Sequence, residues 1–348
     1  MYEASCAIHV HSTFSDGTKT IPEIIALARK AGAEVLIFTD HRTLKGRREG
    51  YEGWHDGLLV LFGEELNDSD NVNHYLGFGY DEEVPGGLGA GGPKGYVAEV
   101  RKRGGFGFLA HPLERGIIHP KFHAYPWTAK DAEGYDGIEI WNWMSAFKGS
   151  VRLGNAIRRL LFPHSGVRAP DPEVLAMWDR ANRSGHVAAI AGIDAHALGY
   201  RFLGIPFTVF SYERTLRTLR TQVLLKEPFV KDAARDRETV FSALRNGRSY
   251  VVNLAFGDPR GFSFQALSGG QPAGVGEEIS LKGEAVLRVE SPKGTDIKMV
   301  RDGELAAQGL GRRMEFRAHR PGVYRAEVWM KDKGWIFTNP IRITTPRA

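Results

Sequence analysis

The stretch that decides the fold is residues 9–41, HVHSTFSDGTKTIPEIIALARKAGAEVLIFTDH. It starts in a short apolar strand candidate, residues 7–10, and reaches a second buried strand at residues 35–39. Between them, the apolar spacing of residues 22–31 predicts a helix with Thr20 as its N-cap. A strand, a helix and a second strand in this order predict a parallel β-α unit.

The same alternation continues to about residue 255. Further strands are expected at residues 58–62, 74–80, 106–110, 137–141, 187–193 and 205–210, and helices at 97–103, 151–161, 172–184 and 237–246. We interpret the glycine-rich segment 85–95 as a loop, or as a mobile active-site lid, because no Gly-Lys-Ser/Thr follows in a Walker frame. Repeated β-α units indicate an α/β barrel or a doubly wound sheet.

From residue 250 onward the pattern changes to short strands separated by turn signals. They are expected at residues 250–253, 262–267, 285–289, 298–301, 313–317, 324–330 and 341–344. This spacing predicts an antiparallel, all-β sandwich. We therefore divide the chain into residues 1–255, the α/β domain, and 256–348, a β-sandwich accessory domain.

Composition is that of an ordinary globular protein. The 348 residues are 42% hydrophobic and 25% charged, which fits one large and one small domain. The single cysteine, Cys6, excludes an internal disulfide and is expected to be a small buried side chain. No secretory signal pattern or apolar run of about 20 residues occurs, so a soluble cytoplasmic protein without membrane contact is expected. The net charge of +5 suits an anionic substrate without requiring nucleic acid.

Histidines and carboxylates follow almost every predicted strand of the first domain. They are His9, His11, Asp16, His41, Glu65 with its neighbour Glu64, His74, His111, Asp194 and His196. Because parallel strands end on the same face, we expect these side chains to gather there. Burying so many of them unpaired would cost several kcal/mol per group, which indicates a metal site.

The donor types narrow the choice of metal. Imidazole and carboxylate ligands suit Zn, Mn or Fe, and so many ligands imply two or three divalent ions. A hydroxide bridging two such ions can attack an ester, and phosphate esters gain most from the added positive charge.

These motifs together resemble the PHP (polymerase and histidinol phosphatase) superfamily. The pattern is His-x-His, Ser-Asp-Gly, Thr-Asp-His, Gly-x-Glu, a histidine, Ala-His-Pro and Asp-x-His, in order over about residues 7–200. The resemblance implies a distorted (β/α)7 barrel that binds up to three ions. It assigns one ion to His9, His11 and Asp194, a second to Glu65, His74 and His111 with Glu65 bridging, and a third to Asp16, His41 and His196. Glu64 is the adjacent alternative to Glu65, and an exposed strand-end histidine is the alternative for His74.

Two later segments resemble the carbaryl-hydrolase-like (CehA/McbA) branch of that superfamily. They are SALRNGRSYVVN at residues 242–253 and WIFTNPIRI at residues 335–343. This branch implies a barrel joined to a C-terminal sandwich and hydrolysis of carbamates or esters.

Several further residues are candidates for contacts with the substrate. Arg42, Arg115 and Arg201 could bind an anionic group, although Arg42 and Arg115 could equally form ion pairs with nearby carboxylates. His119 or His123 could act as general acid, the alternative being a solvated loop histidine. Asn142 could bind substrate or water, and Trp141 could stack on a ring or fill the core. We expect Glu65, Asp194, Arg115 and His119 to be catalytic.

The leading hypothesis is a metal-dependent phosphoesterase that acts on a small metabolite, a nucleotide or an oligonucleotide end. The alternative is a carboxylic-ester, carbamate or amide hydrolase with the same metal site. A third, a non-catalytic binding module, conflicts with the complete ligand set. The second domain is expected to brace the barrel or to support a homo-oligomer.

Overall fold

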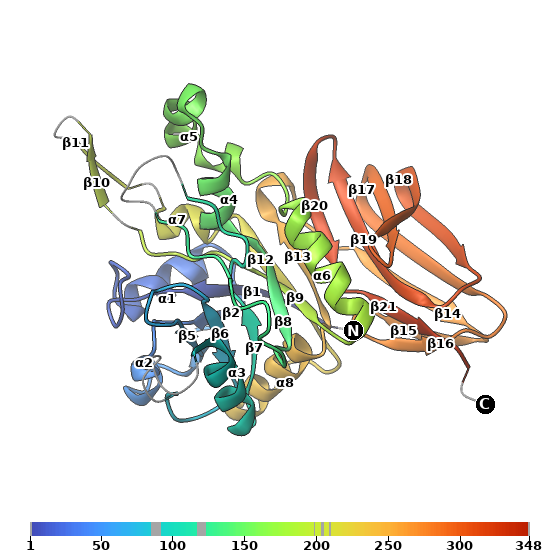
Figure 1. Ribbon diagram of the computed structural model, residues 1–348, viewed down its shortest axis with the longest axis horizontal. Coiled ribbons are helices and arrows are strands. Elements are labelled where there is room, and N and C mark those ends of the chain that lie inside the picture. The colour runs from blue at the N-terminus through green and yellow to red at the C-terminus, as the bar shows by residue number, and fades with distance from the viewer. Residues whose placement is uncertain are drawn as a thin grey trace.

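The computed structural model describes residues 2–84, 92–116, 123–197, 199–202, 205–208 and 210–346, with side chains at 160, 199–202 and 205–207 left undescribed. An N-terminal α/β part lies beside a C-terminal all-β part, as Figure 1 shows. In the described ranges, no helix has the length and apolar character needed to cross a membrane.

The first sheet of the α/β part is built on the N-terminal strand. Strand β1 (Tyr2–Val10) runs parallel to β2 (Val35–Phe38), which pairs in parallel with β4 (Leu58–Phe62). On its other side β1 pairs antiparallel with β12 (Leu219–Leu225). The strands β3 (Gly53–His55) and β13 (Ser249–Asn253) extend this sheet beyond β4 and β12.

A second sheet of five strands has the order β5, β6, β7, β8, β9. Its strands are β5 (Glu64–Leu66), β6 (Tyr75–Phe78), β7 (Phe106–Leu109), β8 (Gly137–Asn142) and β9 (Ala188–Gly192). The pairs β7–β8 and β8–β9 are parallel, whereas β6 runs antiparallel to both of its neighbours. The first residue of β6 therefore lies level with the last residues of β7, which brings the start of one strand to the end of another.

The two sheets meet through single bridges rather than continuous ladders. Val10 bridges to Ala195, and His41 bridges to Glu65. Among the described residues the strands do not close into a barrel, so the expected (β/α)7 barrel is not confirmed and the fold is a mixed α/β arrangement. Parallel pairing, as expected for β-α units, joins β1–β2, β2–β4, β7–β8 and β8–β9, whereas β6 and β12 run antiparallel to their partners.

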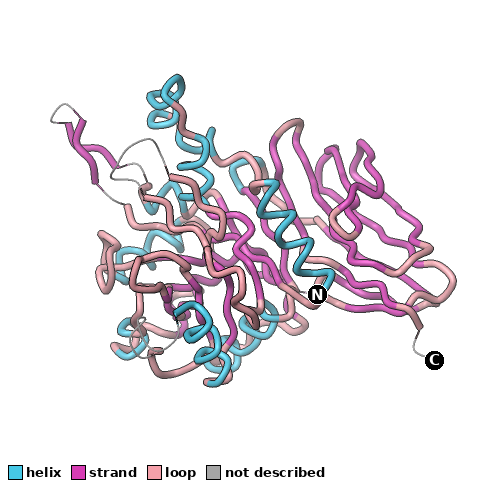
Figure 2. The backbone as a smooth tube through the Cα atoms, viewed as in Figure 1, coloured by secondary structure: helices cyan, strands magenta, loops and turns pink. Residues whose placement is uncertain are grey.

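Helices lie around these sheets, with α5 projecting away from them (Figure 1 and Figure 2). They are α1 (Ile21–Lys30), α2 (Lys45–Arg48), α3 (Gly92–Lys102), α4 (Trp143–Ser150), α5 (Ala156–Leu161), α6 (Pro172–Ser184), α7 (Tyr212–Thr215) and α8 (Ala233–Arg245), with 3₁₀ turns at Leu153–Asn155, Pro163–Gly166 and Leu254–Phe256. Helix α1 confirms its prediction to within one residue. Thr20 and Glu23 form a capping box at its start, and Ile21, Ile24 and Ala28 are buried.

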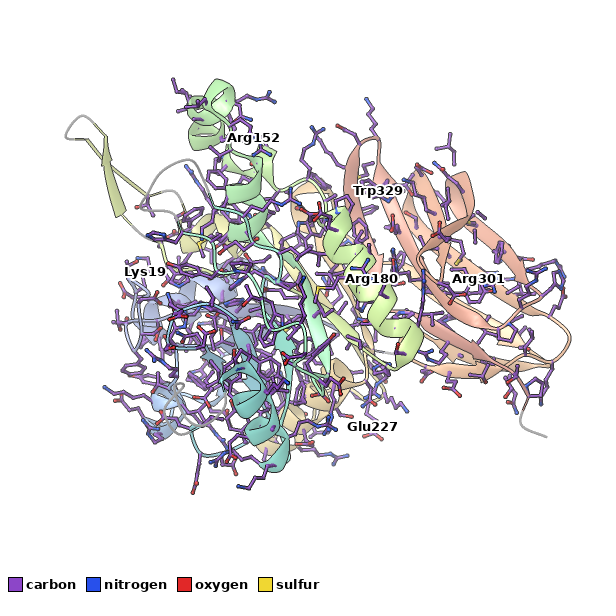
Figure 3. All side chains as sticks on the ribbon, in the orientation of Figure 1. Lys19, Arg152, Arg180, Glu227, Arg301 and Trp329 are labelled. Carbon is purple, nitrogen blue, oxygen red and sulfur yellow. The ribbon has the colours of Figure 1, made fainter. Side chains whose placement is uncertain are left out.

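The all-β part contains β14 (Ser263–Ser268), β15 (Gln271–Gly274), β16 (Glu278–Ser280), β17 (Ala285–Arg301), β18 (Glu304–Ala318), β19 (Gly322–Met330), β20 (Lys333–Thr338) and β21 (Ile341–Thr344). All of its ladders are antiparallel except β16–β21. An apolar core lies among them and includes Trp335, Ile336 and Leu287. Figure 3 labels Trp329 and Arg301 on this part, with Arg180 on α6 beside it.

One hydrogen-bonded sheet passes from one part to the other. Strand β13 pairs antiparallel with β20, with Val251 opposite Phe337. The boundary predicted near residue 255 lies between these two strands along the chain and stays a proposal, because a ladder joins the parts that it would separate.

Several elements differ from the expectations. Helix α4 and strand β12 were not predicted. Helix α3 begins at Gly92, inside the segment 85–95 that was predicted to be a loop. Residues 85–91 of that segment lie outside the described residues. Residues 285–289 and 298–301 are not two strands but belong to the single strand β17. The Ser-Pro-Lys-Gly sequence at residues 291–294 lies inside this strand, and pairing with β18 on both sides of an irregularity in register carries the strand past it.

Candidate metal centre

All nine sequence-predicted metal-binding residues converge on one region between the two sheets. His9 lies on β1 and Glu65 on β5, His74 directly precedes β6, and His111 and Asp194 follow β7 and β9. Eight of the nine residues have at most intermediate exposure, and Asp16 alone is exposed.

Glu65 is at the centre of this cluster. Its Oε1 lies 2.7 Å from His74 Nδ1 and 3.2 Å from His111 Nε2. Its Oε2 lies 3.1 Å from His9 Nε2, 3.0 Å from His11 Nε2 and 3.5 Å from His41 Nδ1. One carboxylate thus contacts five imidazoles, and the bridging role expected for Glu65 stays a proposal.

Asp16 and Asp194 complete the cluster on the side of His196. Asp194 Oδ1 lies 3.3 Å from His196 Nδ1 and 3.7 Å from the Nε2 atoms of both His9 and His11. Asp16 approaches His196 Nε2 at 3.1 Å and His41 Nε2 at 3.7 Å. The sets His9–His11–Asp194 and His11–Asp16–His41–His196 each offer ligand atoms within 4.8 Å of one another.

The backbone is unusual at three of these positions. His9, His111 and Asp194 have φ values of 67°, 29° and 51°, in the left-handed region that non-glycine residues rarely adopt. At His9 the register of β1 on β2 shifts between Ile8 and Val10, so the strand contains a bulge there. The two histidines of His-x-His therefore do not converge by simple strand alternation, because the bulge redirects the first one. Strained positions of this kind cluster at functional sites.

Burial and opposite charge compete at the carboxylates. Burial alone would raise the pKa values of Glu65 and Asp194, but the surrounding imidazoles hold both pKa values well below their usual range. For His111, burial opposes the charged form, yet the hydrogen bond to Glu65 and the nearby carboxylates raise its pKa to about 9. Burial lowers the pKa of His41 to about 3. The carboxylates of the cluster are thus ionised at neutral pH.

The cluster fits divalent cations. His11 Nε2, His41 Nδ1 and His111 Nδ1 are buried and have no hydrogen-bond partner with good geometry among the described residues. The His11 and His196 rings stack with centroids 4.0 Å apart. Repulsion between like charges would disfavour this stacking if both imidazoles were protonated. Buried imidazole nitrogens beside ionised carboxylates are the donor set that transition-metal ions take. The cluster therefore suggests divalent metals, without indicating which ones or how many.

A second row of residues orients these donors. Glu139 Oε1 accepts a hydrogen bond from His9 Nδ1 at 2.8 Å, and Glu139 Oε2 accepts from the His111 backbone N–H at 2.7 Å and from Asn142 Nδ2 at 2.9 Å. Gly192 allows this approach, because a Cβ atom there would overlap the Glu139 carboxylate. No role was predicted for Glu139 from the sequence. Its place three residues before the end of β8 was the available signal.

Asn142 belongs to this second row. Its Nδ2 also lies 3.3 Å from Asp194 Oδ2, and its Oδ1 accepts from the Ser145 N–H and caps helix α4. These contacts give Asn142 a positioning role, and the substrate contact expected for it stays a proposal.

A cavity of about 130 Å³ adjoins the cluster. Besides cluster residues, its wall includes Asn71, Glu114, His123, Tyr125, Met144, Lys148 and Phe210. Sequence reasoning considered only His123 among these seven. Lys148 lies on α4, the helix that was not predicted, and Glu114 and Tyr125 carried no motif.

The remaining substrate candidates lie away from this cavity or outside the described residues. Arg115 is half-exposed and pairs with Glu173 at 2.8 Å and with Asp171 at 3.5 Å, the ion-pair alternative considered for it. Arg42 is exposed and, in the described part of the chain, has no carboxylate within 4.0 Å. His119 lies outside the described residues, and Arg201 is on β10 (Gly199–Phe202), which pairs with β11 (Ile205–Thr208), but its side chain is not described.

Two alternatives are resolved by position. Glu64 is directed away from the cluster and accepts a hydrogen bond from the Val84 N–H, so Glu65 is the member of the pair that meets the histidines. Trp141 is 1% exposed and packs edge-to-face on Phe337 of the all-β part, which is the core role considered for it.

Comparison with known protein families gives one clear match. The model of the PHP domain family matches residues 7–136. The chain contains a PHP domain. The matched range includes seven of the nine cluster residues, namely His9, His11, Asp16, His41, Glu65, His74 and His111.

Two curated proteins resemble parts of this PHP-domain chain. A phosphoribosyl 1,2-cyclic phosphate 1,2-diphosphodiesterase of Eggerthella lenta is 37% identical over 83 residues, which is 22% of this chain and 32% of that protein. The chain thus matches about a third of the length of that relative. An uncharacterised protein of Methanocaldococcus jannaschii is 26% identical over 147 residues, 39% of this chain and 80% of that protein.

Two solved structures are also similar to this PHP-domain chain. One, from Bacteroides vulgatus, is a two-domain protein containing a predicted PHP-like metal-dependent phosphoesterase; it covers 97% of this chain and 95% of its own, with a TM-score of 0.43 and 15% identity. The other, from Bifidobacterium adolescentis, is proposed to be a metal-dependent phosphoesterase; it covers 61% of this chain and 94% of its own, with a TM-score of 0.35 and 18% identity.

Proposed function

We propose that this protein is a metal-dependent phosphoesterase that hydrolyses a phosphate ester of a small metabolite, a nucleotide or an oligonucleotide end. The observation that carries the proposal is the contact of one buried carboxylate, Glu65, with five imidazoles inside a PHP domain. The diphosphodiesterase name of the Eggerthella lenta relative supports phosphate esters as the substrate class.

The nine cluster residues would hold two or three divalent ions of Zn, Mn or Fe. In the proposed assignment, His9, His11 and Asp194 would hold one ion, His74 and His111 a second, and Asp16, His41 and His196 a third. Glu65 would be shared between the first and the second. Bound ions would supply Lewis acidity to activate water and to neutralise charge on a phosphoryl group.

The protein residues prepare the site for this chemistry. Glu139 accepts a hydrogen bond from the Nδ1–H group of His9. The His9 Nε2 lone pair therefore lies on the side of Glu65 and Asp194. Asn142 restrains Glu139 and Asp194 together, and Asp40 accepts hydrogen bonds from Ser12 and Ser15 to order the loop that carries Asp16. The rigid donors thus need little rearrangement when a cation or substrate enters.

One observation favours the second candidate, hydrolysis of a carboxylic ester, carbamate or amide. Lys148 is the single lysine or arginine among the described residues that line the cavity, and Arg115 is neutralised by Glu173 and Asp171. A carbonyl substrate requires fewer cations than a phosphate does. The wider barrel architecture, the accessory role of residues 256–348 and a homo-oligomeric state stay proposals.

Metal analysis followed by parallel assays tests both candidates. The purified protein is assayed on phosphomonoester, phosphodiester, carboxylic-ester and carbamate substrates, before and after chelation and with Mn or Zn restored. We expect chelator-sensitive hydrolysis of a phosphate ester. Hydrolysis confined to carboxylic esters or carbamates would select the second candidate, and a metal-free protein that gains no stability from added Mn or Zn would contradict both.

A further inference from the structure

Lys148 is a buried cation in the wall of the cavity beside the metal cluster. It lies in the last turn of α4, its residue is 4% exposed, and it lines the cavity together with His74 and His111. Lysine is rarely buried to this extent unless it is paired, so its position requires an explanation.

The contacts of Lys148 leave part of its bonding capacity free. Nζ donates to Glu114 Oε1 at 2.9 Å and approaches the His123 carbonyl at 3.4 Å. An ammonium group has three N–H donors, and the third has no partner among the described residues. Glu114 also accepts from the Tyr125 N–H at 2.9 Å through its other oxygen, so its carboxylate is fixed from two sides.

Lys148 and the cluster residue His74 both lie against one aromatic ring, that of Tyr125. The Tyr125 ring stacks on the His74 ring with centroids 5.3 Å apart, and Lys148 Nζ lies 5.4 Å from the centroid of the same Tyr125 ring. His74 in turn contacts Glu65 at 2.7 Å. The ammonium group therefore lines the same cavity as Glu65 and His74.

A purely structural role explains this pair poorly. Taking a lysine and a glutamate out of water costs several kcal/mol, and apolar residues of similar size would pack a wall equally well. A buried pair at the edge of a cavity becomes useful when a third, anionic partner arrives, because the unused donor can then form a charge-assisted hydrogen bond.

We propose that Lys148 is a substrate-binding residue that donates to an oxygen of the phosphoryl group, and that Glu114 is the positioning residue that holds it there. This inference rests on the proposed phosphoesterase function and assigns its anion-binding cation. Glu114 keeps the empty cavity wall neutral and fixes the direction of the ammonium group.

Inorganic phosphate is the probe, with binding to the metal-loaded protein measured by calorimetry beside steady-state kinetics and metal content. Lys148→Met removes the charge with little change in length, Lys148→Arg keeps it, and Glu114→Gln keeps an acceptor while removing the negative charge. The double variant Glu114→Gln/Lys148→Met leaves no unpaired charge, so it covers the case in which Lys148→Met alone fails to fold.

We expect Lys148→Met, alone or in the double variant, to weaken phosphate binding at least about tenfold, the effect of one charge-assisted hydrogen bond. KM should rise similarly while metal content is unchanged, and Lys148→Arg should restore much of the loss. Glu114→Gln should bind phosphate as well as the parent or more tightly. Lys94→Met, which breaks an exposed pair with Asp131, is the matched control and should change nothing.

Phosphate binding to Lys148→Met within twofold of the parent overturns the inference. Equal weakening by Glu114→Gln and Lys148→Met also overturns it, because the pair would then only order the segment around Tyr125. A parent protein that neither binds phosphate nor hydrolyses any phosphate ester marks failure of the proposed function itself and removes the inference with it.

Discussion

Glu139 and His9 form a buried hydrogen bond of 2.8 Å between strands β8 and β1, 130 positions apart in the chain. The Glu139 carboxylate is held in place by hydrogen bonds from the His111 N–H and from Asn142 Nδ2. The other ring nitrogen of His9, Nε2, faces Glu65. A carboxylate behind a ligating imidazole sets its tautomer and raises its basicity.

Glu139→Gln should therefore weaken metal binding about 10- to 100-fold without unfolding the protein. The change removes the negative charge behind His9 and places an amide N–H₂ toward at least one of the present donors. Competition with a chromophoric chelator measures the affinity. Glu133→Gln, at an exposed position, is the control. Unchanged affinity in Glu139→Gln would show that His9 does not bind metal through Nε2.

Asp194→Ala and His11→Ala should each abolish hydrolysis while the chain stays folded. Each removes a donor from the set His9–His11–Asp194, and the lost groups contribute charge and lone pairs rather than apolar core. Turnover should fall by at least about 10³-fold, with the circular dichroism spectrum retained. Parent-like turnover in both variants would remove the proposed assignment of these residues.

The sequence predicted the components of this centre better than its architecture. The nine donors could be found because each follows or precedes an apolar strand, and order along the chain is all that such an argument requires. Glu114 and Lys148 could not be found in this way, because their roles depend on contacts between segments that carry no motif. Glu139 lies near the end of a strand, but its hydrogen bonds to His9 and His111 depend on tertiary contacts. The bulge at His9 and the antiparallel strand β6 were hidden for the same reason, since pairing direction and register are set by tertiary contacts.

Glu64 should make stability depend on pH. Burial raises the pKa of its carboxyl to about 7, so the folded chain keeps a proton that the unfolded chain loses near its ordinary pKa. Because the folded state binds more protons in this window, the free energy of unfolding should fall as pH rises from about 4.5 to 7.

Glu64→Gln keeps an acceptor for the Val84 N–H and has no proton to lose. Relative to the parent, it should gain roughly 1–3 kcal/mol at pH 8 and little at pH 4.5. Urea unfolding of chelator-treated protein at both pH values measures this difference. Glu82→Gln, at a side chain that is 89% exposed, should leave the pH dependence as it is. A parallel shift of the Glu64→Gln curve at both pH values would contradict the prediction.

Arg325 should be a major determinant of stability where the two parts meet. Its guanidinium forms two hydrogen bonds of 2.8 Å with Asp179 on α6 and contacts Glu327 on β19, and all three residues are buried. Arg325→Met leaves two buried carboxylates without a cation and should cost about 3–5 kcal/mol. Arg288→Met breaks the exposed pair with Glu315 and should change stability by less than about 1 kcal/mol. Equal unfolding midpoints for the two variants would contradict this expectation.

The ladder between β13 and β20 determines what a C-terminal truncation would expose. If the chain ended at residue 255, residues 250–252 would keep their ladder with β12 but lose their partners on β20, and the exposed strand edge could pair with other molecules. The truncation would also remove Asn339, whose side chain donates hydrogen bonds to the carbonyls of Ala189 and Ser249. The α/β part is therefore expected to be poorly soluble by itself, because the all-β part covers this strand edge in the full chain.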